Sequence, residues 1–224
     1  MMRRKIPENM RVNKVVKYFV LADLSLFAGW GFVAPLLSVF VIEEISGATL
    51  FTVGASAGIY WLSRAVVQPP LALALDKKRG EKDDLYVLIM GLIGIGVSVT
   101  VLPYIKTIPQ LYLYEAVNGV AFGMYSVPWA AIFSRHLDKD RFAFDWSLDR
   151  ATLGVSVAVA SLLGGGLADE MGFKVPFTAA GILAILAALI IFLTPEISRA
   201  PRGGDKRSGE AEVNIRGRGL PASH

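Results

Sequence analysis

Six long apolar stretches, separated by short polar segments, set the pattern of this chain. They cover residues 17–42, 50–75, 85–104, 108–133, 148–168 and 175–193. Each is long enough to cross the hydrocarbon core of a bilayer as a helix, which takes about 20 residues. A membrane-spanning strand would be about half as long and would alternate apolar with polar residues. Because lipid cannot hydrogen bond to the backbone, the pattern predicts an all-α membrane protein with six transmembrane helices.

Polar residues are concentrated at the two ends of the chain. Of the 224 residues 54% are hydrophobic and 19% are charged, and the mean hydropathy is +0.50. We expect a basic cytoplasmic N-terminus over residues 1–16, the six-helix transmembrane domain over 17–194 and a disordered cytoplasmic tail over 195–224. The first apolar stretch is too long for a signal peptide and contains Asp23, so we expect it to be retained as a helix.

The basic residues predict the orientation of the helices. They gather before the first stretch, after the second, between the fourth and fifth, and after the sixth, whereas the loops on the opposite side carry only Lys106 and Lys174. Because Lys and Arg near helix ends are retained in the cytoplasm, we expect both termini inside, in a prokaryotic plasma membrane. The same charges attract anionic lipid, so the net charge of +4 does not indicate nucleic-acid binding.

Three segments of the chain resemble motifs of one transporter family. They are Leu75–Lys82 after the second stretch, Leu111–Gly119 in the fourth, and Leu163–Phe177 between the fifth and sixth. Taken in this order, they make residues 15–195 resemble the N-terminal half of a major facilitator superfamily transporter. The resemblance implies half of a two-bundle fold that moves a small solute by alternating access. It also implies a cytoplasmic gating loop, for which Asp76, Lys77 and Arg79 are the candidates.

The chain departs from the family pattern in its motifs and in its length. Ala72 and Arg79 stand where the gating loop has glycine, and Glu115 replaces the Arg of the fourth-helix motif. The Pro of the antiporter motif is missing ahead of Gly164, so the sequence does not support exchange as the transport mode. Full members resemble two six-helix bundles, which are parallel repeats, and a second copy in the same orientation could supply the missing one. The open alternative is the N-terminal half of a split or truncated transporter.

Charged side chains inside the apolar stretches are the main candidates for a substrate or proton path, because they are costly in lipid and face the bundle interior. Asp23, Arg64 and Glu115 are the three that we identify. Helical rise places Asp23 and Arg64 closest in depth, so we expect them to form an ion pair. Glu115 would then lack a cation in its own bundle and could carry a proton. Alternatively, Glu115 reaches the outer surface by snorkelling.

Uncharged residues complete the predicted path and its packing. Trp30, Gln68 and Asn118 could line a cavity for an organic substrate, the last two as amides at depth. Pairs of glycines four residues apart, Gly54-x-x-x-Gly58 and Gly119-x-x-x-Gly123, are typical of closely packed transmembrane helices. We expect packing to be their role.

Motifs for catalysis or metal binding are weak. Residues 54–58 match the G-x-S-x-G nucleophile pattern, but no strand precedes them and no His lies in an apolar stretch. The chain has no Cys and only two His, so we expect neither an enzyme nor a metal or other cofactor. The expected partners are the lipid bilayer, a small-molecule substrate, protons and a second six-helix unit, most simply in a homodimer. A membrane scaffold without transport, which need not enclose a water-filled cavity, is the remaining alternative.

Overall fold

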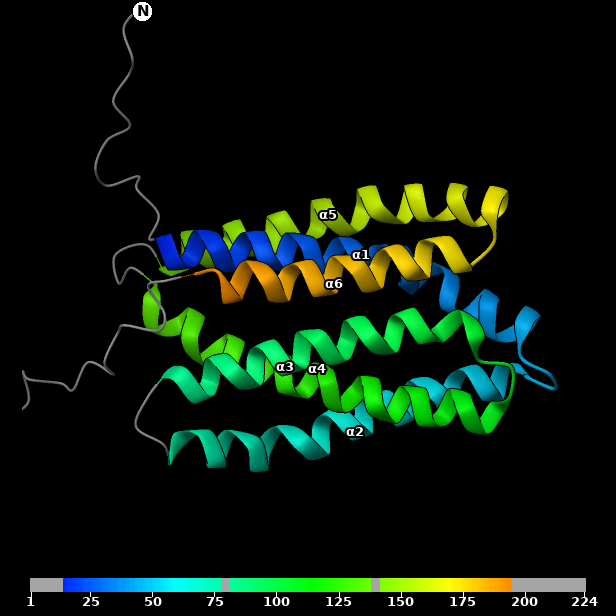
Figure 1. The fold of residues 1–224 in the computed structure, drawn as a ribbon, viewed down its shortest axis with the longest axis horizontal. Helices are drawn as coiled ribbons and strands as arrows, with labels where there is room; N and C mark the ends of the chain where they lie inside the picture. The colour runs from blue at the N-terminus through cyan, green and yellow to red at the C-terminus, as the bar shows by residue number, and fades with distance from the viewer. Residues whose placement is uncertain (1–13, 78–80, 138–141, 195–224) are drawn as a thin grey trace, which may run out of the picture.

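The computed structural model describes residues 14–77, 81–137 and 142–194, which form helices joined by short loops (Figure 1). The elements are α1 (Lys14–Glu44), α2 (Leu50–Asp76), α3 (Glu81–Val101), the short 3-10 helix η2 (Leu102–Tyr104), α4 (Ile108–His136), α5 (Phe142–Met171) and α6 (Lys174–Phe192). These six α-helices are long and apolar enough to cross a membrane. The predicted all-α fold with six transmembrane helices is therefore confirmed. The largest difference is in α5, which begins at Phe142 rather than at residue 148.

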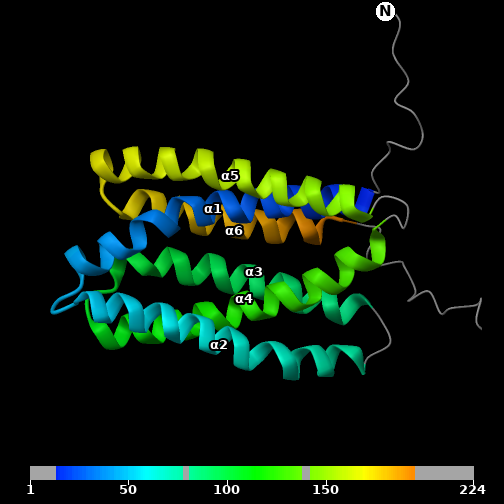
Figure 2. The ribbon, with the colours of Figure 1, turned by 180° about the vertical axis from the view of Figure 1, so that it is seen from behind.

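The helices form two groups, with α1, α5 and α6 in one and α2, α3 and α4 in the other (Figures 1 and 2). α1 packs along α5 and α6, α4 packs along α2 and α3, and the contact of α3 with α6 joins the groups. α2 and α5 each have one main neighbour and are the least buried spans. The start of α1 and the end of α6 lie at the same end of the molecule (Figure 1).

Aromatic side chains join α1, α4 and α5 near the end at which α1 begins. The ring of Phe133 on α4 stacks on that of Trp129, with centroids 4.7 Å apart, and lies 6.3 Å from the ring of Phe19 on α1. Trp146 on α5 packs edge-on against Phe133 at 5.2 Å. Such contacts add about 0.5–1.5 kcal/mol each beyond area burial. They hold the first turns of α5 against the bundle, where sequence analysis expected a loop.

Glycines at positions 119 and 123 allow α4 to approach α2 closely. A Cβ at Gly119 would lie 2.4 Å from the carbonyl oxygen of Tyr60, and one at Gly123 would lie 2.3 Å from a methyl carbon of Val67. The packing role predicted for this pair is therefore confirmed. Gly54 and Gly58 differ, since a Cβ at either would meet nothing within 4 Å. Within the described residues nothing packs on this pair, so its predicted packing role stays a prediction.

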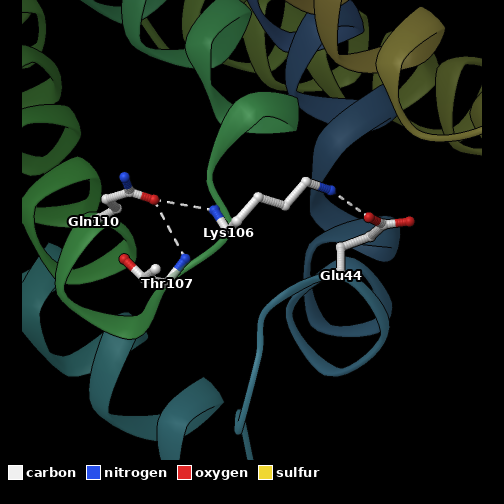
Figure 3. Close-up of polar contacts among 4 residues, drawn as sticks. All are labelled: Glu44, Lys106, Thr107 and Gln110. Atoms are coloured by element: carbon white, nitrogen blue, oxygen red, sulfur yellow. Dashed lines mark hydrogen bonds and ion pairs between the residues drawn. The ribbon is translucent and has the colours of Figure 1, made fainter.

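At the end opposite the start of α1, polar contacts join two loops (Figure 3). The ammonium of Lys106 donates to the carboxylate of Glu44 at 2.5 Å. The side-chain oxygen of Gln110 accepts from the backbone N–H of Lys106 and of Thr107, at 3.1 and 3.3 Å. The ion pair is well exposed, so it contributes at most about 1 kcal/mol. Its clearer effect is to place the first turn of α4 beside the end of α1.

Replacing Gly119 by Ala tests the close contact of α2 with α4. The added methyl group would overlap the backbone of α2, so we expect Gly119→Ala to lower the free energy of unfolding by about 1–3 kcal/mol. Gly154→Ala on α5 is the control, because the same methyl group meets nothing within 4 Å there and should leave stability unchanged or slightly higher. Thermal unfolding in detergent measures both. Equal stability of the two variants would contradict the helix contact.

Candidate functional site

A cavity of about 150 Å³ lies between α1, α2 and α4 and holds the carboxyl group of Glu115. Besides four aliphatic residues, its lining contains aromatic, hydroxyl and carboxyl side chains, namely Trp30, Ser38, Ser56, Tyr60, Trp61 and Glu115. A larger hollow of about 460 Å³ lies between α3 and α4, but its lining contains no acidic or basic side chain. The smaller cavity is thus the candidate site, because it combines aromatic rings, hydroxyl groups and a carboxyl group.

Glu115 is enclosed within the bundle. It lies in the second turn of α4 and is 3% exposed, so in this structure its side chain does not snorkel to the surface. Among the described residues, no side chain or backbone group forms a hydrogen bond or ion pair with its carboxyl group. The predicted lack of a cation partner stays a prediction. A buried carboxyl group without a counter-ion favours its neutral, protonated form.

Arg64 lies beside this cavity but does not contact Asp23. Its guanidinium donates to the hydroxyl oxygen of Tyr60 at 3.3 Å and lies 5.3 Å from the ring centroid of Trp61. The ring of Tyr60 in turn stacks on that of Trp30, with centroids 6.3 Å apart. The predicted ion pair between Asp23 and Arg64 is therefore wrong for this structure. The prediction compared only the depths of Asp23 and Arg64 along their helices, whereas in the structure Asp23 bonds to Tyr125 and Arg64 to Tyr60.

Asp23 belongs to a second polar cluster, where α1 meets α4 and α5. Its carboxylate accepts a hydrogen bond from the hydroxyl group of Tyr125, with an O–O distance of 2.6 Å. Asp149 on α5 is buried as well, three residues after Trp146, whose ring lies 5.8 Å from that of Trp129, and both Asp residues are at most 3% exposed. Asp149 was missed in the sequence because it is only the second residue of the predicted span, where charged side chains are expected at the membrane surface. The spacing of Asp145 and Asp149, one helical turn apart, was the available signal.

The two predicted amides join helices to one another. Gln68 on α2 donates to the hydroxyl oxygen of Ser126 on α4 at 2.8 Å. Asn118 on α4 accepts from the hydroxyl group of Ser98 on α3 at 3.0 Å and is 1% exposed. Both thus satisfy buried polar groups between helices. Neither lines the cavity of Glu115.

The predicted gating loop is described only in part. Asp76 is the last residue of α2 and Lys77 follows it, and both are exposed, whereas Arg79 lies outside the described residues. At the same end of the bundle, a guanidinium nitrogen of Arg135 on α4 lies 2.8 Å from a carboxylate oxygen of Asp84 on α3. This contact between neighbouring helix ends was not predicted. Within the described ranges, no group of three or more His, Cys, Asp or Glu side chains is placed to hold a metal ion.

A double-mutant cycle tests the separation of Asp23 from Arg64. Because each side chain bonds to a different group, we expect the destabilisations of Asp23→Asn and Arg64→Gln to add in the double variant, with a coupling below about 0.5 kcal/mol. Thermal unfolding of the four proteins in detergent gives this value. A double variant clearly more stable than that sum would restore the ion pair.

Comparison with known proteins agrees with this architecture. The model of the family described as Major Facilitator Superfamily matches residues 19–221. The MFS-type transporter MJ1560 of Methanocaldococcus jannaschii is 26% identical over 187 residues, which are 83% of this chain and 47% of that protein. The MFS-type transporter YitZ of Bacillus subtilis is 25% identical over 169 residues, 75% of this chain and 99% of that protein. Both are described as uncharacterized.

The chain thus spans about half the length of the archaeal relative and nearly the full length of the bacterial one. The family match covers five of the six helices in full and most of α1. The six apolar helices and this match lead to the same conclusion. The chain is an integral membrane protein of the major facilitator superfamily, and its six transmembrane helices form half of that fold.

Proposed function

We propose that this protein is a secondary active transporter that moves a small solute by alternating access. The observation that carries the proposal is the enclosed carboxyl group of Glu115 in a cavity between α1, α2 and α4. An ionisable group at membrane depth without a counter-ion is costly for a scaffold and useful in a transport path. Family membership supports the same reading.

The cavity suits a small organic solute. Trp30 and Tyr60 offer stacked aromatic surface, and Ser38 and Ser56 offer hydroxyl groups. Arg64 donates to the hydroxyl oxygen of Tyr60 and so supplies a positive charge beside the lining of the cavity. A few polar groups in an otherwise apolar pocket can orient a bound molecule. In this proposal Glu115 carries the coupled proton, which it binds and releases as access alternates.

Bent helices would support such a change of access. α1, α2 and α4 each continue through proline, at Pro35, at Pro69 and Pro70, and at Pro128. Proline removes a backbone hydrogen bond and weakens the helix locally. Figure 1 shows α1 and α4 changing direction along their length. The three helices that line the cavity are also the ones that contain these weak points.

The second bundle of the transporter is supplied, in this proposal, by a second copy in a parallel homodimer. α2 and α5 each leave one flank without a helix neighbour, and Gly54 and Gly58 leave room for a backbone to approach α2. The basic residues favour a single orientation, with both termini in the cytoplasm. The alternative is a separate six-helix chain, since the archaeal relative is about twice as long.

Replacing Glu115 by Gln tests the proton-coupling role. The amide has the same shape but does not ionise, so pH-driven accumulation should fall to background while exchange at equal solute concentrations survives. Uptake into proteoliposomes, with a solute found by screening, measures both. Glu43→Gln is the control, because Glu43 is an exposed carboxylate at the far end of α1. Full proton-driven uptake by the Glu115 variant would refute the assignment.

Cysteine substitution tests the homodimer. The chain has no Cys, so a single introduced thiol cannot form a disulfide within its own chain, and a cross-linked product of twice the mass identifies a second copy. We expect Gly58→Cys to cross-link in native membranes under mild oxidation, because two α2 helices packed around a two-fold axis would bring this position of both copies together. Val97→Cys is the control, since Val97 is exposed on α3, away from the open flank of α2. A monomeric mass in lipid nanodiscs, together with equal cross-linking of both variants, would contradict the dimer.

A further inference from the structure

We propose that the hollow between α3 and α4 binds one acyl chain of an anionic phospholipid, with the lipid phosphate beside Lys174. The hollow has a volume of about 460 Å³ and lies toward the end of the bundle opposite the start of α1 (Figure 1). It shares no lining residue with the cavity of Glu115. The proposal therefore concerns a second site and does not depend on the transport function proposed above.

The hollow opens to the outside of the bundle. From α4 it is lined by Leu113 and Val117, which are 67% and 50% exposed. With 3.6 residues per turn, both lie on the opposite side of α4 from Glu115. From α3 it is lined by Val97 and Val101, and about half of each side chain is exposed. In a membrane this surface contacts lipid rather than the interior of the bundle.

The depth of the hollow matches one leaflet of a bilayer. Its lining begins at Tyr104 and Gln110, beside the loop that joins α3 to α4, and ends at Gly94 and Val117. The helical rise from Tyr104 to Gly94 is about 15 Å. That is half of the hydrocarbon core, which is about 30 Å thick. An acyl chain that enters at the loop could therefore follow the hollow to the middle of the bilayer.

The packing of α3 on α4 gives the deep end of the hollow a fixed and apolar form. A Cβ at Gly91 would lie 2.5 Å from the backbone nitrogen of Tyr125, so the two helices are in close contact there. Ser98 lines the hollow, but its hydroxyl group donates to Asn118 at 3.0 Å. Its hydrogen-bonding capacity is thus used within the bundle. The deep end suits a hydrocarbon chain better than a polar solute.

A cation lies at the loop end of the hollow. The ammonium group of Lys174 is 5.2 Å from the ring centroid of Tyr104, which lines the hollow. Lys174 is exposed, and within the described ranges it forms no ion pair. It is also the first residue of α6, whose N-terminal end carries a partial positive charge. This position favours a negatively charged group above the acyl chain.

Gln110 adds a hydrogen-bond donor to the same end. Its side-chain oxygen accepts from the backbone N–H groups of Lys106 and Thr107, and its amide nitrogen bonds to none of the residues drawn in Figure 3. The ammonium of Lys106 is already paired with Glu44, which leaves Lys174 as the available cation of this loop. A phosphate can accept from both donors. A headgroup without an ammonium of its own, as in phosphatidylglycerol, complements the charge of Lys174 best.

Photolabelling of the unaltered full chain tests where the lipid lies. The protein is reconstituted in phosphatidylcholine with a small fraction of phosphatidylglycerol that carries a diazirine on one acyl chain, then illuminated and digested. We expect label in residues 94–105 and 110–117, about fivefold above that from phosphatidylcholine with the same labelled chain. Residues 182–189 of α6, which include exposed apolar side chains, are the reference and should not distinguish the two lipids.

Native mass spectrometry in detergent tests the role of Lys174. Lys174→Gln should lower the affinity for phosphatidylglycerol about fivefold, to that for phosphatidylcholine, because one Lys near the headgroup contributes a factor of this size. Lys174→Arg keeps the charge and should keep the preference. Lys17→Gln is the control, since Lys17 is an exposed lysine at the opposite end of the bundle.

A larger side chain in the hollow tests the place of the acyl chain. The indole of Val101→Trp would occupy the space between α3 and α4, so tight binding of the first lipid should be lost for both headgroups. Ile182→Trp is the control, because Ile182 is 59% exposed on α6 and does not line the hollow. Thermal unfolding of both variants identifies any loss that is due to misfolding.

Three results would overturn the proposal. Equal affinity of the unaltered chain for the two lipids would remove the role of Lys174. Full binding of lipid by folded Val101→Trp would place the acyl chain elsewhere. Disulfide cross-linking of Val97→Cys, which lies in the lining, would make a second copy of the chain the occupant of the hollow.

Discussion

Close approach of helix backbones at glycine underlies the whole bundle. In lipid no hydrophobic force drives helices together, so their association depends on tight van der Waals packing. Each main contact contains such a site. A Cβ at Gly31 would lie 2.8 Å from the backbone of α5, one at Gly29 2.8 Å from that of α6, and one at Gly91 2.5 Å from that of α4. The same holds between α3 and α6 at Gly96 and between α2 and α4 at Gly119.

The polar sites lie where this tight packing is missing. α1 has only slight contacts with α2 and α4, and the space between these helices is filled by large rings and by the cavity of Glu115. Trp30 and Tyr60 stack across it, and Phe122 packs edge-on against both. A glycine contact at this position would have closed the cavity. Because the other helix pairs are held by close contacts, the space between α1, α2 and α4 can contain polar side chains.

The helices could be predicted from the sequence because length and composition alone decide whether a segment can span lipid. The partners of the charged residues could not. Depth along a helix follows from residue number, but the direction of a side chain around the axis depends on packing, which is why Asp23 bonds to Tyr125 and not to Arg64. Asp149 was missed for a related reason. Aromatic contacts extend α5 beyond the apolar stretch, so that Asp149, the second residue of the predicted span, lies well inside a helix and is buried.

The two carboxyl sites are connected by continuous packing through Phe122. Its ring lies 5.3 Å from that of Trp30, which lines the cavity, and 6.3 Å from that of Tyr125, which bonds to Asp23. The guanidinium of Arg64 lies over the same ring, at 5.8 Å. Coupling between sites requires contacts that both sites can shift, and here one side chain touches the neighbours of each. A molecule that displaces Trp30 would press on Phe122, and the resulting movement of Tyr125 would change its hydrogen bond to Asp23.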